Sequence, residues 1–75
     1  METSDLLRAA GEALYGAYGW QSELARQLEV PLRSMQRYAA GGTTPDALLP
    51  QIKRMVLARQ KEIDAVLRKF EKAEV

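Results

Sequence analysis

The sequence predicts an all-α domain, a small helix-turn-helix unit of four to five helices that ends in one long helix. Apolar residues recur three and four positions apart along most of the chain, which is typical of amphipathic helices. Glycine and proline gather at a few points, mainly residues 16–19 and 41–50, where they separate helices. No stretch alternates like a half-buried strand. With 75 residues, the chain has room for a single domain.

The amino-acid composition excludes several kinds of site and function. Cysteine and histidine are absent, so disulfides and a Cys/His metal site are excluded. We find no phosphate-binding loop and no spaced carboxylate cluster, so we expect no enzyme activity, cofactor or small-molecule ligand. The acidic N-terminus is unlike a signal peptide, and no apolar run approaches the ~20 residues of a membrane span. We therefore expect a cytoplasmic protein without a membrane partner.

Net charge is only +1, and its distribution is a weak indication of a nucleic-acid partner. The acidic residues of positions 1–19 are separated from basic residues in the centre and the C-terminal part. A mixed-charge surface in water explains the same pattern nearly as well.

The first helix is expected over residues 4–15, with Ser4 or Thr3 as its N-cap. Gly11 costs ~1 kcal/mol inside a helix and marks a close approach of another helix. Trp20 precedes the next helix and is expected to pack on Leu24 as a hydrophobic staple. The expected apolar stripe consists of Leu6, Leu7, Ala10, Ala13 and Leu14.

The central stretch, residues 21–40, reads as two short helices, 21–28 and 32–40, joined by a tight turn. Helices joined so tightly cross steeply and share a small buried wedge. Gly41 and Gly42 end the second of them. The residues expected to fill the wedge are Leu24, Ala25, Leu28, Val30, Met35 and Tyr38.

A linker follows, in which Thr44 is expected to cap a helical turn at residues 45–49, with Pro45 as its first residue. Because Pro50 cannot lie deep in a helix, the long helix is expected over residues 50–72. Its apolar positions follow a heptad spacing. This helix is longer than the domain needs to cover its own core, which favours a homodimer; the alternative is that it folds back on the first helix. The expected dimer interface is Val56, Arg59, Ile63, Val66, Leu67 and Phe70.

The central stretch resembles the helix-turn-helix of the lambda-repressor/Xre-like family of bacterial and phage DNA-binding regulators. The residues that carry the resemblance are Gln21, Leu24, Ala25, Leu28, Glu29, Val30, Met35 and Tyr38. The compact layout is also similar to phage and mobile-element regulators, including anti-CRISPR-associated repressors. Two positions depart from the family: Glu29 stands where glycine is usual in the turn, and Pro31 stands where serine or threonine usually caps the recognition helix.

The resemblance implies a sequence-specific regulator of double-stranded DNA, a repressor that binds an inverted repeat as a homodimer. Arg33, Gln36 and Arg37 share one helix face, and these residue types can bond guanine and adenine edges in the major groove. Leu32 is a further base-contact candidate. The phosphate-contact candidates are Gln21, Ser22, Ser34, Arg26, Lys53 and Arg54. The alternative is a helical interaction module that docks a partner protein through the C-terminal helix.

Overall fold

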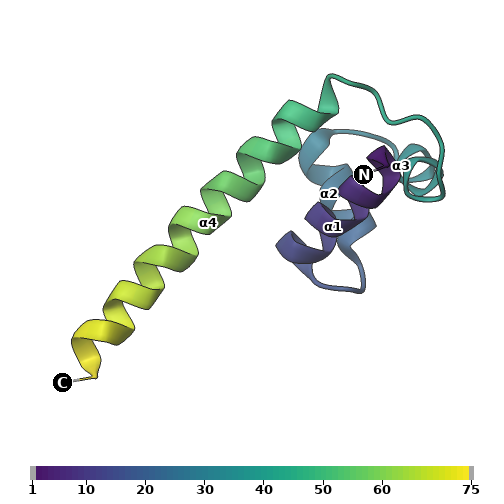
Figure 1. The fold of residues 1–75 in the computed structure, drawn as a ribbon. Helices are drawn as coiled ribbons and strands as arrows, with labels where there is room; N and C mark the ends of the chain where they lie inside the picture. The colour runs from purple at the N-terminus through teal and green to yellow at the C-terminus, as the bar shows by residue number, and fades with distance from the viewer. Residues whose placement is uncertain (1, 75) are drawn as a thin grey trace.

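The computed structural model describes residues 2–74 and is all-helical over that range (Figure 1). Its four helices are α1 (Thr3–Tyr15), α2 (Trp20–Leu28), α3 (Leu32–Ala39) and α4 (Leu48–Ala73). The predicted fold class and the long C-terminal helix are therefore confirmed. Among the described residues, no helix is long and apolar enough to cross a membrane.

The molecule has two regions, which we call the head and the tail. The head is residues 2–59, in which α1, α2, α3 and the first half of α4 pack together. The tail is residues 60–74, and every one of its residues is exposed. It projects away from the head as a straight continuation of α4 (Figure 1), which gives the molecule extents of 50 × 22 × 21 Å.

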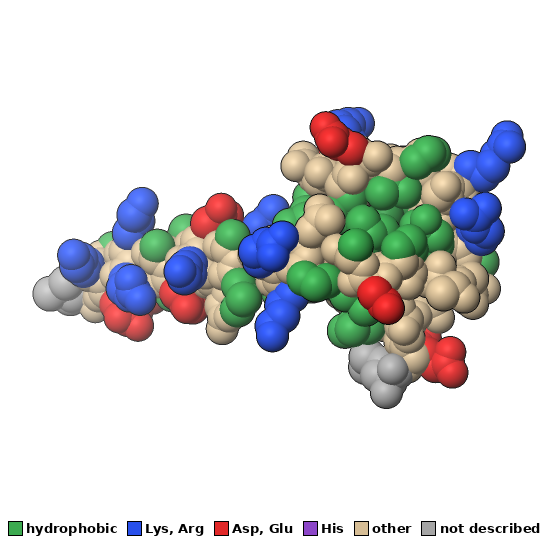
Figure 2. All heavy atoms as spheres, turned by 90° about the horizontal axis from the view of Figure 1, so that it is seen from above, with side chains coloured by type: hydrophobic (Ala, Val, Ile, Leu, Met, Phe, Trp, Pro, Cys, Tyr) green, Lys and Arg blue, Asp and Glu red, His purple; other side chains and the backbone are tan. Residues whose placement is uncertain are grey.

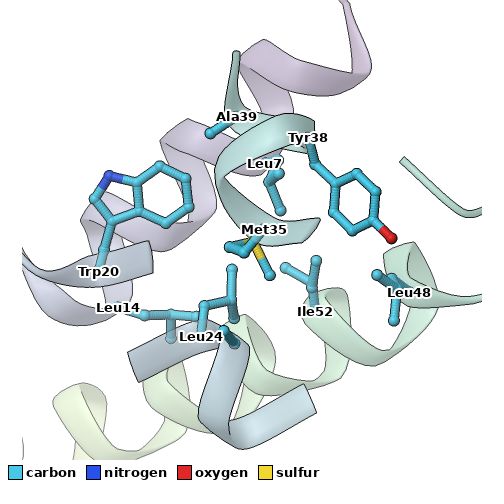
Figure 3. Packing of buried hydrophobic residues seen from close by; sticks show 10 residues of the cluster. Leu7, Leu14, Trp20, Leu24, Met35, Tyr38, Ala39, Leu48 and Ile52 are labelled. Carbon is cyan, nitrogen blue, oxygen red and sulfur yellow. The ribbon is translucent and has the colours of Figure 1, made fainter. Parts of the chain in front are cut away.

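Each helix contributes apolar side chains to the one core, which lies inside the head (Figure 3). Leu7, Leu24 and Met35 have no exposed surface, so the centre of the core joins α1, α2 and α3. Ile52 and Leu48 close it from α4. The predicted wedge is confirmed, because its six residues are all buried or half-buried: Leu24, Ala25, Leu28, Val30, Met35 and Tyr38.

The close approach predicted at Gly11 is confirmed, and its partner is Trp20. A Cβ atom at Gly11 would overlap the six-membered ring of the indole. Trp20 is the first residue of α2 and is buried, so its prediction as a staple ahead of the helix is wrong. The indole is instead part of the core, because only glycine leaves room for it on α1.

The predicted stripe of α1 is half right. Leu7 and Leu14 are buried and lie seven residues apart, which is two helical turns. Leu6 and Ala13 each precede one of them and are turned by ~100°, so both are exposed. The helix also begins one residue earlier than predicted: Glu2 occupies the N-cap position and makes no side-chain capping bond, so the predicted cap at Ser4 or Thr3 is wrong.

The linker before α4 also differs from the prediction. Thr44 is buried at 3% exposure and its Oγ1 has no hydrogen-bond partner, so it caps no helix. The turn lies at residues 46–47, where Leu48 N–H bonds the carbonyl of Pro45. Helix α4 begins two residues before Pro50, which is compatible with proline because N–H groups of the first turn have no partner in the helix.

Two arginines join helices of the head. Arg8 Nη2 donates to the carbonyl of Ala39, 2.9 Å away, at the last residue of α3. Arg59 Nη1 donates to the carbonyl of Leu14, 2.9 Å away, in the last turn of α1. Both cations lie at helix C-termini, where unpaired carbonyls and the helix dipole favour positive charge. Arg59 thus ties α4 to α1 at the point where the head ends.

Candidate functional site

The turn between α2 and α3 folds around a strained residue. Glu29 has φ 57° and ψ 42°, the left-handed conformation that glycine adopts most readily. This conformation lets Val30 N–H donate to the carbonyl of Ala25, 2.9 Å away, which closes the end of α2. The glutamate therefore occupies a glycine-like position, as the departure noted in the sequence implied.

Helix α3 begins without a side-chain cap. Pro31 is at its N-cap position in an extended conformation, and only its carbonyl takes part, accepting the N–H of Met35 at 3.1 Å. The helix begins at Leu32 as predicted. Its first N–H groups are left without partners inside the helix, as at any helix start.

The exposed side of α3 holds every predicted base-contact residue. Met35, Tyr38 and Ala39 are buried in the head. The exposed residues fall within one arc of ~140° on the opposite side, at 100° per residue. They are Leu32, Arg33, Gln36, Arg37 and, beyond the last turn, Ala40. We call this arc the α3 face; it has two arginines and no acidic side chain.

Arg37 has neighbours on its own helix and in the chain that follows it. The Arg37 guanidinium carbon lies 5.7 Å from the centre of the Tyr38 ring. The chain also turns back over Arg37, because Gly42 N–H donates to its carbonyl at 3.0 Å. A Cβ atom at Gly42 would lie 2.9 Å from that carbonyl oxygen and 3.0 Å from Cγ of the arginine. Gly42 therefore leaves space for the Arg37 stem, a role that sequence reasoning missed because it treated Gly42 only as a stop signal.

The predicted phosphate contacts on α2 and α3 differ in their surroundings. Ser22 is exposed and Gln21 half-buried, both in the first turn of α2. Ser34 is half-buried at the rim of the α3 face. Arg26 is exposed but its Nη1 lies 3.3 Å from Oε1 of Glu23, so a carboxylate on its own helix partly neutralises it.

Lys53 and Arg54 are neighbours in sequence but lie on different parts of the head. Arg54 lines a depression beside Gln27 and Leu28, where α2 ends. Lys53 lines a groove between α1 and α4, with Leu6 and Ala10 opposite. The structure therefore does not gather these two cations into one patch.

Positive side chains project from the end of the head opposite the tail, the side on which α3 lies (Figures 1 and 2). On the face of the tail seen in Figure 2, acidic and basic side chains are interspersed. The α3 face differs from it, because it contains two arginines and no acidic side chain.

The predicted dimer residues fall into two groups. Val56 packs against the core of the head, and Arg59 bonds to Leu14 and lies 3.4 Å from Glu62. The other four are about half exposed in the tail: Ile63, Val66, Leu67 and Phe70. The alternative of a fold-back does not describe these four, because the tail points away from α1.

No protein-family model, curated protein or solved structure matches this chain. The assignment of a function therefore depends on the geometry of the head and the tail.

Proposed function

We propose that the protein is a sequence-specific regulator of double-stranded DNA, a repressor that binds an inverted repeat as a homodimer. The observation that carries the proposal is the α3 face. It presents two arginines and a glutamine, without an acidic side chain, on a short helix whose other side is fixed in the core.

The chemistry of that face suits the major groove. An α-helix fits the groove, and arginine bonds O6 and N7 of guanine as glutamine bonds N6 and N7 of adenine. Arg33 reaches outward from the first half of α3, the half that lies deepest in the groove in such complexes, and Gln36 follows one turn later on the same face. Arg37 lies beside the Tyr38 ring, which restricts part of its side-chain freedom before binding.

A homodimer supplies affinity and symmetry. Two α3 faces related by a two-fold axis would bind half-sites ~34 Å apart, one turn of DNA. With a single head and no ligand domain in the described residues, repression by occupying a promoter is the simplest mode of action.

The test begins with selection of duplexes from a random pool by the full chain, at one fixed salt concentration. We expect a recovered inverted repeat that binds at least ~10³-fold more tightly than a scrambled duplex. Affinity that is weak and equal for all sequences would contradict the proposal.

Variants of the α3 face then locate the reading surface. Arg33→Ala and Arg37→Ala should each lose ~1–3 kcal/mol of binding to the selected site. Arg68→Ala removes the same charge from the exposed tail and should bind nearly as well as the wild type. If the α3 variants match the Arg68 control while circular dichroism shows them folded, the proposed reading face is wrong.

A second candidate function, a protein-interaction module, is favoured by one observation, the apolar residues exposed along the tail. Light scattering separates the candidates, since a chain that stays monomeric up to high concentration would leave this apolar surface for a different protein.

A further inference from the structure

A groove of about 780 Å³ lies on the head between α1 and the first half of α4. Its α1 wall is built largely from small residues, Ala9, Ala10 and Ala13, which let another helix approach closely. Its α4 wall includes Leu49, Val56 and, at the edge, Lys53. The groove is thus a shallow apolar channel with one positive rim.

The apolar stripe of the tail continues the same face of α4. At 100° per residue, Leu49 and Leu67 have the same direction, and Val56 and Ile63 differ by ~20°. Phe70 lies in line with Ile52 by the same measure. Each copy therefore carries a concave apolar surface on its head and a convex apolar ridge on its tail, along one line.

We propose that a second copy of this chain fills the groove, with the two α4 helices antiparallel and the tail of each lying in the groove of the other. This inference rests on the homodimer of the proposed function and specifies its arrangement. Such a contact is isologous: the ridge of one copy meets the groove of its partner twice.

The area of the contact favours this arrangement. The 14 helical residues of the tail span ~21 Å, so two tails paired side by side share a strip of only ~200 Å² each, given a helix ~10 Å wide. Stable interfaces bury ~800 Å² per partner. Antiparallel packing engages all 26 residues of α4, ~39 Å, and adds the α1 wall of the groove, so the contact more than doubles.

Register follows from matching ridge to groove. When residue 60 of each α4 lies on the two-fold axis, Phe70 of the partner subunit lies at the level of Leu49 and Pro50. Ile63 of the partner subunit then meets Val56. Figure 1 shows that α1 and α4 run in roughly the same direction, and Arg59 reaches Leu14, so Val66 of the partner subunit lies beside Ala9.

Charge favours the same register. Lys53 lies on one edge of the apolar face, and Asp64 and Glu71 lie on that same edge further along α4. In an antiparallel pair the matching edges meet, so Lys53 falls between Asp64 and Glu71 of the partner subunit, within ~6 Å along the axis of each. A parallel pair would instead bring opposite edges together, which takes Lys53 away from Asp64 and Glu71 of the partner subunit.

The experiment is cysteine pairing, because the chain contains no cysteine of its own. Equal amounts of full-length Ala9→Cys and Val66→Cys are mixed, oxidised and weighed by intact mass spectrometry. The proposal expects the mixed disulfide to exceed the self-linked products at least fivefold. Arg68→Cys is the matched control, because it lies at nearly the same level but points to the opposite side of α4, and it should give no mixed product with Ala9→Cys.

Phe70→Cys gives the contrary outcome: its self-linked dimer as the main product would overturn the proposal, because the two positions lie ~30 Å apart in the antiparallel pair and face each other in a parallel one. A monomeric mass at all concentrations would overturn it too, whether or not a different protein binds the tail.

A charge exchange gives an independent readout in the uncrosslinked protein. Lys53→Glu should raise the dimer dissociation constant at least threefold, and adding Glu71→Lys in the same chain should restore it. A double variant as weak as the single one would contradict the register. Dimerisation measured in this way does not involve DNA, so it can be interpreted even if the protein does not bind DNA. Measurements of DNA binding can likewise be interpreted if this arrangement of the dimer is wrong.

Discussion

The apolar face of α4 is buried in the head and exposed in the tail, although one continuous helix runs through both regions. In the head, Ile52 is 4% exposed because α1, α2 and α3 surround it. In the tail, Phe70 is 59% exposed although it points in the same direction from the helix as Ile52. Periodicity therefore reports which face of a helix is apolar, and the neighbours decide whether that face is buried. The head packs around a core of its own, whereas every residue of the tail is exposed.

The largest expected effect on the free energy of unfolding comes from a leucine-to-alanine substitution, made once in the head and once in the tail for comparison. Leu24→Ala removes a side chain with no exposed surface, so the free energy of unfolding should fall by ~2–5 kcal/mol. Leu67→Ala should change it by less than ~1 kcal/mol in dilute solution and should lower the average mass measured by light scattering. Urea unfolding at several protein concentrations checks both. Equal losses at low concentration would show that the tail packs within its own chain.

Gly11→Ala should have the next largest effect on the free energy of unfolding. The new methyl group collides with the Trp20 ring, and overpacking of this kind costs ~1–3 kcal/mol. A double-mutant cycle with Trp20→Leu checks the cause, since the smaller side chain should absorb part of the loss. Additive losses would mean that the glycine acts through something other than the indole.

Arg59→Met tests the boundary between the two regions. It keeps much of the apolar stem but removes the hydrogen bond to Leu14, so unfolding should require ~1–2 kcal/mol less. Arg68→Met is the matched control in the tail and should lie within ~0.5 kcal/mol of the wild type. If the two variants behave alike in thermal unfolding, the bond does not fasten α4 to the head.

Glu29→Gly should have the smallest effect and the opposite sign. Glycine relieves the left-handed strain of ~1–2 kcal/mol but makes the unfolded chain more flexible, so a net gain of ~0.5 kcal/mol is expected. Glu71→Gly, in right-handed helix within the tail, should give no gain. A loss of stability for Glu29→Gly in chemical unfolding would show that the glutamate side chain compensates the strain.

Much of the candidate site could be predicted from the sequence, because it depends on helix phase alone. Arg33, Gln36 and Arg37 share the exposed side of α3 for the same reason that Met35 and Tyr38 share the buried side. The separation of Lys53 from Arg54 could not be predicted. Adjacent residues on a helix point ~100° apart, and only the positions of α1 and α2 decide what each one faces.

The sequence by itself determined the all-α class, the approximate ends of the main helices and the tight turn at Glu29, since these follow from local spacing and from glycine and proline. Only the tertiary structure decided that Trp20 enters the core over Gly11, that Leu6 and Ala13 are exposed, and that the tail leaves the head. The bonds from Arg8 to α3 and from Arg59 to α1 belong to this second group as well. The reason is physical: each depends on the direction in which one helix crosses another, and the spacing of residues within a single helix carries no record of that direction.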